Sequence, residues 1–149
     1  MKNQNSCTLK STALGLVGFH FLTVVVHSIA HEILSVKATP AQLAFIVPVI
    51  IFAPVMAGLM LPKFSKAGAV MLLVSMLGSL VFGLYYHFIA STPDHVTHVA
   101  RLHPAFWSAM FQITAYLLLA SEALGAMVAG LSLAGWSQSF KRYAVRTDF

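Results

Sequence analysis

Charged residues are scarce in this 149-residue chain: Asp, Glu, Lys and Arg together make up 9% of it, whereas hydrophobic residues make up 58%. A soluble globular domain typically carries about 25% charged residues. Only four residues are acidic. So little polar material cannot cover a water-exposed globule, and the composition predicts an integral membrane protein.

Cysteine and the common catalytic motifs are also lacking. Cys7 is the single cysteine, which excludes an intrachain disulfide and any thiol chemistry that needs a C-x-x-C pair. There is no G-x-S-x-G elbow and no phosphate-binding glycine loop, and "HE" at residues 31–32 is not followed by the second histidine of H-E-x-x-H. The sequence leaves open whether the protein is an enzyme.

Long apolar runs are what the chain has instead, and a run of roughly 20 such residues crosses the hydrocarbon core as a helix. We expect spans at residues 9–34, 40–61, 66–90 and 104–136, a short interfacial helix at 93–101 and a basic C-terminal tail at 137–149. Thr39 is the predicted N-cap of the second span, and Pro40 its first residue. Pro48 and Pro54 should kink that span, with neighbours or water satisfying the freed carbonyls. The prediction is an all-α, single-domain, four-helix membrane bundle over residues 1–149.

The nine lysines and arginines flank the apolar runs and form no sustained basic face. Seven of them lie in the N-terminal segment, around the connection between the second and third spans, or in the C-terminal tail, and only Lys37 and Arg101 stand in the other connections. By the positive-inside rule, this asymmetry predicts cytoplasmic N- and C-termini. We therefore expect the lipid bilayer as a partner, no nucleic acid, and a bacterial inner (plasma) membrane as the location.

The N-terminal segment also has features of a signal peptide, with two lysines, an apolar run and "SIA" at residues 28–30. Cleavage after Ala30 would remove the first span. His20 and His27 interrupt the apolar run that a signal peptide needs, so a retained span is the favoured interpretation.

Three histidines stand in the first span, where lipid favours apolar residues. His20, His27 and His31 share one helical face, because steps of seven and four residues return close to the same direction. His27 and His31 are four residues apart, so both imidazoles can reach one ion. His31 stands 21 residues past the lysine at the start of its span, and His87 stands 21 residues past the lysine at the start of the third span. Each therefore lies about 31 Å along its helix, at the outer face.

More histidines follow in the outer connection "STPDHVTHVARLHP", where Asp94 precedes His98 by four residues and can orient its ring. The predicted metal or haem ligands are His27, His31, His87 and His103, with His95, His98, Glu32 and Asp94 as auxiliary residues. Imidazole suits Cu, Zn and Fe and is an axial ligand of haem. The first hypothesis is thus a transition metal or haem b at the outer face, serving electron transfer, a redox complex or metal handling.

A second polar pair is expected near the middle of the bilayer. Glu122 lies 18 residues into the fourth span from Pro104, at about the level of His20. A carboxylate at that depth requires a partner or a proton. We expect His20 and Glu122 to pair, either to pass protons or to clamp the first and fourth helices together.

Two other functions remain open. Small residues recur at four-residue spacing on the third and fourth spans and favour close helix packing. The protein would then be a non-catalytic membrane subunit or assembly factor with structural histidines, in a homo-oligomer or a larger membrane complex. A third possibility is a proton-coupled small carrier that uses His20 and Glu122, for which four spans would need a dimer.

Overall fold

The computed structural model describes the backbone of residues 2–63 and 65–144, and the side chains of residues 8–63 and 65–135. Within these ranges all regular structure is helical, in the order α1, α2, η1, α3, α4, η2, α5 and α6. Four helical stretches are long and apolar enough to cross a membrane: Thr8–Ile33, Pro40–Met60, Ser65–Ile89 and Ala105–Gly135. The predicted all-helical fold is confirmed, and four helices have the length and composition to cross a membrane.

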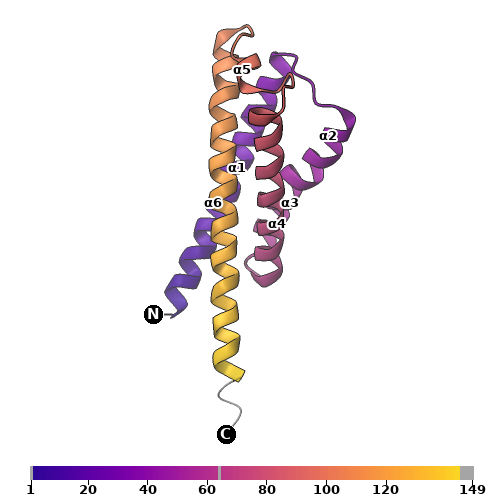
Figure 1. The fold of residues 1–149 in the computed structure, drawn as a ribbon. Helices are drawn as coiled ribbons and strands as arrows, with labels where there is room; N and C mark the ends of the chain where they lie inside the picture. The colour runs from indigo at the N-terminus through magenta and orange to yellow at the C-terminus, as the bar shows by residue number, and fades with distance from the viewer. Residues whose placement is uncertain (1, 64, 145–149) are drawn as a thin grey trace.

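The bundle is built around α6 (Ala105–Ala144), which packs along both α1 (Lys2–Ile33) and α4 (Ser65–Leu84) (Figure 1). The described ends of α1 and α6 lie at the same end of the bundle, opposite the short helix α5 (Val96–Val99). The fourth helix was predicted to end near residue 136, but its backbone continues to Ala144 and so includes much of the predicted tail. Residues 145–149 of that tail lie outside the described residues.

The second span consists of α2 (Pro40–Phe45), a π-helical turn η1 (Ile46–Phe52) and α3 (Ala53–Met60). Thr39 caps it as predicted: its hydroxyl accepts from the backbone N–H of Gln42, and the Gln42 side chain accepts from the backbone N–H of Thr39. Pro48 lies in η1, where the hydrogen-bonding pattern widens from four residues to five. The lower part of the span packs on α4, whereas α2 leans away from the bundle (Figure 1).

The small residues of α4 bring that helix close to α6. A methyl group added at Gly83 would lie 3.5 Å from Leu119, and one at Gly125 would lie 3.0 Å from Met76. Ser75 and Ser79 on α4 are also buried. Close packing by small residues is a common way to join helices in a membrane, and here it joins α4 to α6 within one chain.

The connection between the third and fourth spans folds differently from the prediction. The interfacial helix was expected over residues 93–101, but α5 begins at Val96 and His95 is its N-cap. The His95 ring accepts from the backbone N–H of Thr97. The Thr92 hydroxyl donates to the carbonyl of Tyr86, which ties this loop to the end of the third span.

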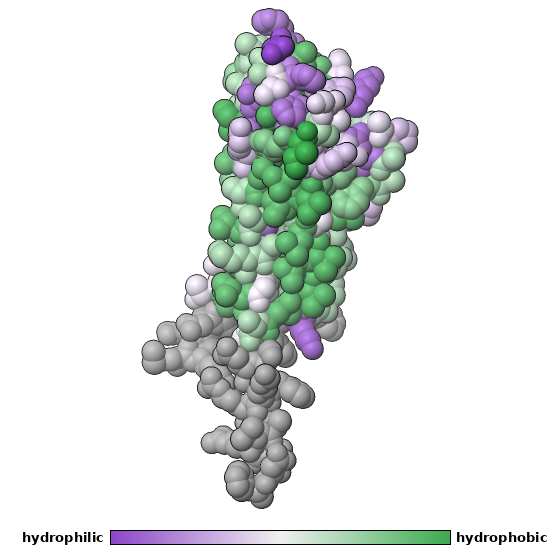
Figure 2. Space-filling model, in the orientation of Figure 1, coloured by the Kyte–Doolittle hydropathy of each residue, from purple (hydrophilic) through white to green (hydrophobic). Residues whose placement is uncertain are grey.

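The surface has the distribution expected for a chain that crosses a membrane. Figure 2 shows hydrophobic residues covering the middle of the bundle and hydrophilic residues gathered at the α5 end. Leu22, Leu59 and Val81 are each at least 65% exposed, although they would be costly to expose to water. A lipid environment accounts for this apolar exterior.

Candidate metal centre

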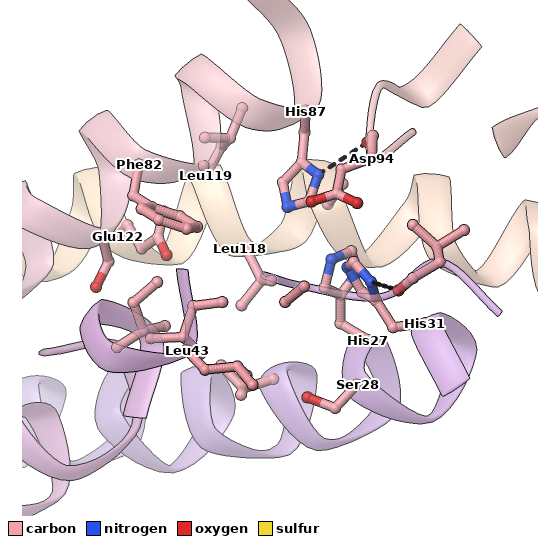
Figure 3. Close-up of a pocket in the computed structure, with 18 of the residues that line it drawn as sticks. His27, Ser28, His31, Leu43, Phe82, His87, Asp94, Leu118, Leu119 and Glu122 are labelled. Carbon is pink, nitrogen blue, oxygen red and sulfur yellow. Dashed lines mark hydrogen bonds between the residues drawn. The ribbon is translucent and has the colours of Figure 1, made fainter. Parts of the chain in front are cut away.

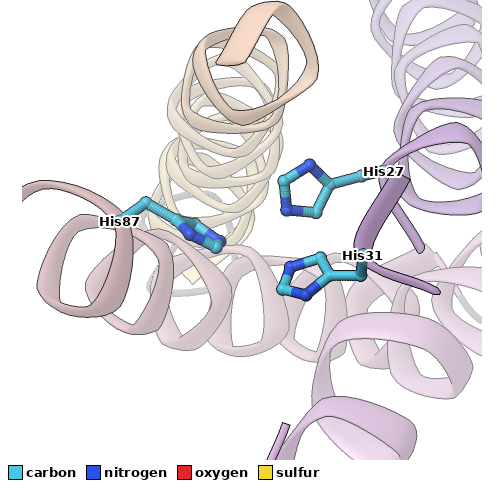
Figure 4. A group of neighbouring side chains, drawn as sticks. All are labelled: His27, His31 and His87. Atoms are coloured by element: carbon cyan, nitrogen blue, oxygen red, sulfur yellow. The ribbon is translucent and has the colours of Figure 1, made fainter. Parts of the chain in front are cut away.

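Three histidines meet near the α5 end of the bundle. His27 and His31 lie on successive turns of α1, and His87 lies on η2 (Tyr85–Ile89), the π-helical turn that continues α4. Each offers one ring nitrogen such that the three atoms lie within 4.8 Å of one another. Figure 4 shows the three rings grouped around a common space. The predicted convergence of the first and third spans on one histidine cluster is therefore present, and these three residues can hold a metal ion.

The end of α1 fixes the His31 ring. Ser35 adopts a left-handed conformation with φ of 55°, and the N–H groups of Ser35 and Val36 return to the carbonyls of Glu32 and His31. This pair of bonds is the Schellman arrangement that ends many helices. The resulting turn brings the Val36 carbonyl to 2.8 Å from Nδ1 of His31. A carbonyl can only accept, so Nδ1 of His31 carries the proton.

The loop between the third and fourth spans fixes the His87 ring in the same way. Nδ1 of His87 lies 3.0 Å from the backbone carbonyl of Asp94. The side chain of Asp94 is buried, and its Oδ2 accepts from the amide of Gln42 at 3.4 Å. Nδ1 of His87 must likewise donate its proton to the carbonyl. Asp94 thus anchors the loop to the second span while its backbone orients His87.

The third ring is held by α6. Nδ1 of His27 lies 2.8 Å from Oγ1 of Thr114. The Thr114 hydroxyl donates its own proton to the carbonyls of Met110 and Phe111, at 2.7 and 3.0 Å. When the single Thr114 proton points to one of these carbonyls, its oxygen accepts from His27, and Nδ1 of His27 is then protonated as well.

In the neutral form, His31 and His87 therefore carry the proton on Nδ1 and keep a lone pair on Nε2, and Thr114 can accept from the same tautomer of His27. Nε2 of His27 is buried and has no hydrogen-bond partner among the described residues. Metal-binding histidines are usually oriented by a hydrogen bond from the nitrogen that does not bind the metal. Three ring nitrogens within 4.8 Å of one another could together hold a cation.

Phe111 on α6 packs against all three rings. It is fully buried, and its ring centroid lies 4.5 Å from that of His27, 4.7 Å from that of His31 and 5.4 Å from that of His87. The rings of His27 and His31 are 4.8 Å apart, and those of His27 and His87 are 5.0 Å apart. Phe111 therefore forms an apolar wall that limits how far the imidazoles can turn.

The histidines line one end of a cavity of about 420 Å³ between the second span and the rest of the bundle. Figure 3 shows His27, His31, His87 and Asp94 at one end of this cavity and Phe82, Leu119 and Glu122 at the other. Exposed Glu32 and Lys37 also border it. Of the side chains that the structure describes, three acidic residues line the cavity, namely Glu32, Asp94 and Glu122, against a single lysine. Although the chain has a net charge of +5, this cavity favours cations.

The other predicted ligands lie apart from this cluster. His103, predicted as a fourth ligand, is exposed ahead of α6. His95 bonds the Phe88 carbonyl at 3.2 Å and the Thr97 hydroxyl at 2.8 Å. His98 is exposed and bonds the Thr92 carbonyl rather than Asp94, which was expected to orient it. Depth in the bilayer placed these histidines at the correct end of the bundle but not in the cluster.

The expected pair of His20 and Glu122 is also replaced by other contacts. Both side chains are buried, but Nε2 of His20 lies 3.1 Å from the Ile50 carbonyl, and its Nδ1 lies 3.4 Å from the hydroxyl of Ser121. Ile50 precedes Pro54 by four residues, and Pro54 has no N–H to donate to this carbonyl. His20 therefore satisfies a carbonyl that the proline leaves free, and Oε2 of Glu122 has no partner among the described residues.

Several residues of the site were not foreseen. Thr114, Phe111 and the Val36 carbonyl were not among the predicted site residues. Thr114 is the one for which a signal existed, because it is a hydroxyl in an apolar helix near the level of His27. The backbone carbonyls of Val36 and Asp94 carry no sequence signal, since every residue has one.

Comparisons of this chain with protein-family models, curated proteins and solved structures find no match. The candidate metal centre therefore rests on its own geometry.

Proposed function

We propose that the protein is a membrane metal-binding protein that holds one transition-metal ion through Nε2 of His27, His31 and His87. One observation carries the proposal: three imidazoles each offer a ring nitrogen within 4.8 Å of the others, and hydrogen bonds at Nδ1 leave Nε2 of each neutral ring available to bind a metal. Lone pairs repel one another, so a cation between them stabilises the arrangement. Ligation would bring the three nitrogens to about 3.4 Å from one another, as zinc–nitrogen bonds of ~2.0–2.1 Å require.

The ligand set favours a borderline metal, with zinc and copper first. Imidazole suits Zn, Cu, Fe and Ni, whereas Mg and Ca prefer oxygen. Three protein ligands leave a further position for water or an exchangeable group. Since all three histidines line the cavity, that position is reachable from it. A reachable ion fits metal handling better than a closed structural site.

A b-type haem fits the same residues less well. Haem iron bound by two histidines takes them from opposite faces, and the porphyrin fills the plane between them. His31 and His87 are far enough apart for this, with ring centroids separated by 6.0 Å. His27, however, lies within 5.0 Å of both rings, in the space that a porphyrin would fill. The geometry favours a bare ion.

The predicted topology indicates on which side of the membrane the metal centre lies. If both termini are cytoplasmic, as the lysine and arginine distribution predicts, the metal centre lies near the opposite face. In a bacterial inner membrane this is the periplasmic face. The protein would then receive or release its metal outside the cytoplasm.

The direct test is metal stoichiometry in protein purified without a polyhistidine tag. After dialysis against zinc or copper and removal of free metal, elemental analysis should find about one ion per chain. His87→Gln should weaken binding more than about 100-fold, because even loss of a residue that only orients a ligand costs about 10–100-fold. His103→Gln removes an exposed imidazole near the same face and serves as the matched control, with an expected change of less than about twofold. Equal losses in both variants, or no bound metal in the folded wild-type protein, would refute the proposal.

A further inference from the structure

The end of the cavity away from the histidines contains a second polar site. Oε2 of Glu122 on α6 and Oγ of Ser79 on α4 are buried and have no hydrogen-bond partner among the described residues. Glu122 is 2% exposed and Ser79 is fully buried, yet both line the cavity. A polar atom without a partner in such surroundings costs free energy. Something that enters the cavity can recover that cost.

Glu122 on α6 faces the same part of α4 that carries Ser79. A methyl group built on Gly83 would be 3.6 Å from Oε2 of Glu122, and Ser79 lies one turn below Gly83 on that helix. The absence of a side chain at Gly83 leaves this carboxyl oxygen facing α4. The carboxyl and hydroxyl groups therefore form one end of the cavity rather than two unrelated points.

The walls between this end and the histidines are apolar. They are formed by residues of all four spans: Val24, Leu43, Ile46, Ile50, Phe82 and Leu118. Phe82 stacks on Phe45, with ring centroids 5.1 Å apart and the planes 7° from parallel, so its ring is held in place. A bare inorganic ion would gain nothing from these walls. An organic molecule would bury its apolar part against them.

The carboxyl group of Glu122 favours a ligand whose polar group is positively charged. Among the described side chains, Glu122 is the only Asp, Glu, Lys or Arg at the end of the cavity away from the histidines. Asp94 lies at the histidine end (Figure 3), and Glu32 and Lys37 are chain neighbours of His31 and of Val36, whose carbonyl His31 contacts. A buried carboxylate without a counter-charge is unfavourable, and a bound ammonium group supplies one together with hydrogen-bond donors. A cation near Phe82 also gains from the face of an aromatic ring.

We propose that this cavity binds a small organic amine in its protonated form. Its ammonium group would donate to Glu122 and Ser79, and its apolar body would lie against Phe82, Ile50 and Leu118. The volume of about 420 Å³ is within the range of small-molecule pockets. The amine site does not rest on metal binding, because it uses the end of the cavity away from the histidines.

The test compares three probes of equal chain length, hexylamine, hexan-1-ol and hexanoate, binding to the protein in lipid nanodiscs. Empty nanodiscs give the lipid background, and a chelator in parallel samples excludes coordination of the amine by bound metal. Hexylamine should bind saturably and at least about tenfold more tightly than hexan-1-ol, because a hydrogen bond to a charged group is worth ~1.5–3 kcal/mol. Hexanoate should not bind. Equal binding of the amine and the alcohol would overturn the proposal.

Two variants locate the site. Glu122→Gln keeps the shape and removes the charge, and it should lower hexylamine affinity about tenfold without changing that of hexan-1-ol. Ser79→Ala should lower it about threefold. Ser75→Ala is the matched control, because Ser75 is equally buried one turn away, donates to the Leu72 carbonyl and does not line the cavity. Unchanged amine affinity in Glu122→Gln would overturn the proposal, and so would Glu122-dependent binding of rubidium without amine binding.

The outcomes separate this site from the metal centre. Metal stoichiometry is measured on the same Glu122→Gln protein and should stay at one ion per chain. A wild-type protein that binds hexylamine but no metal would refute only the metal centre, and the reverse result would refute only the amine site. If Glu122→Gln does not fold, the comparison of three probes and the pair of serine variants still decide the question.

Discussion

Two buried histidines on one face of α1, His20 and His27, differ in how many of their ring nitrogens have a hydrogen-bond partner. They stand seven residues apart on α1 and are 1% and 6% exposed. Both ring nitrogens of His20 have a protein partner, the Ile50 carbonyl and the Ser121 hydroxyl. His27 has a partner for Nδ1 only, and its Nε2 has none.

The difference shows how to distinguish a structural histidine from a ligand in a membrane helix. A ring with both nitrogens satisfied joins helices, and here His20 joins α1 to η1 and α6. A ring that is hydrogen-bonded through one nitrogen only is oriented, and its second nitrogen is available to bind an ion. Burial alone does not separate the two cases, because both rings are buried.

The sharpest test of the comparison is to replace each histidine by glutamine and to measure metal stoichiometry and affinity. His27→Gln should abolish stoichiometric zinc or copper binding, with affinity falling more than about 100-fold, since it removes a ligand and not only a residue that orients one. His20→Gln should leave the stoichiometry at one ion. Loss of metal in His20→Gln protein that is still folded would contradict the division into structural and ligand histidines.

The hydrogen bond that orients His27 offers a smaller effect. Thr114→Val keeps the shape of the side chain and removes the acceptor for Nδ1, so the ring is free to turn and to change tautomer. We expect metal affinity to fall about 10–100-fold, the usual cost of losing such a partner.

Thr23→Val is the matched control for that substitution. Thr23 is buried on α1, and its hydroxyl donates to the Phe19 carbonyl of its own helix rather than to a histidine. Its metal affinity should stay within about twofold of wild type. If both valine variants bind metal equally well, Thr114 does not orient the ligand.

The smallest effect concerns the stability that His20 provides. His20→Ala leaves the Ile50 carbonyl without its donor and should lower the free energy of unfolding by ~1–2 kcal/mol. Pro54→Ala restores a backbone N–H four residues after Ile50, so the His20→Ala cost in that background should shrink by ~1 kcal/mol. Reversible unfolding of the four proteins in mixed micelles measures this coupling, and strictly additive costs would disprove it.

Local rules made much of the fold predictable. Thr39 and Pro40 begin the second span as expected because a cap depends only on neighbouring residues. His27 and His31 were predicted to share a face, and His87 their level, because helix geometry converts residue numbers into direction and depth. The prediction of His103 as a fourth member of the cluster was wrong because His103 lies in a loop. Depth along a helix says nothing about where a loop side chain lies.

The sequence by itself determined that the chain has four apolar helices and that histidines gather at one end, because hydropathy and helical periodicity are local properties. Only the tertiary structure decided which nitrogens are free. That depends on backbone carbonyls such as those of Val36 and Asp94, and on the hydroxyl of Thr114, which reach the rings only after the chain has turned back on itself. It also decided that Ile50 and Ser121, rather than Glu122, satisfy His20, since packing chooses partners among residues at the same depth.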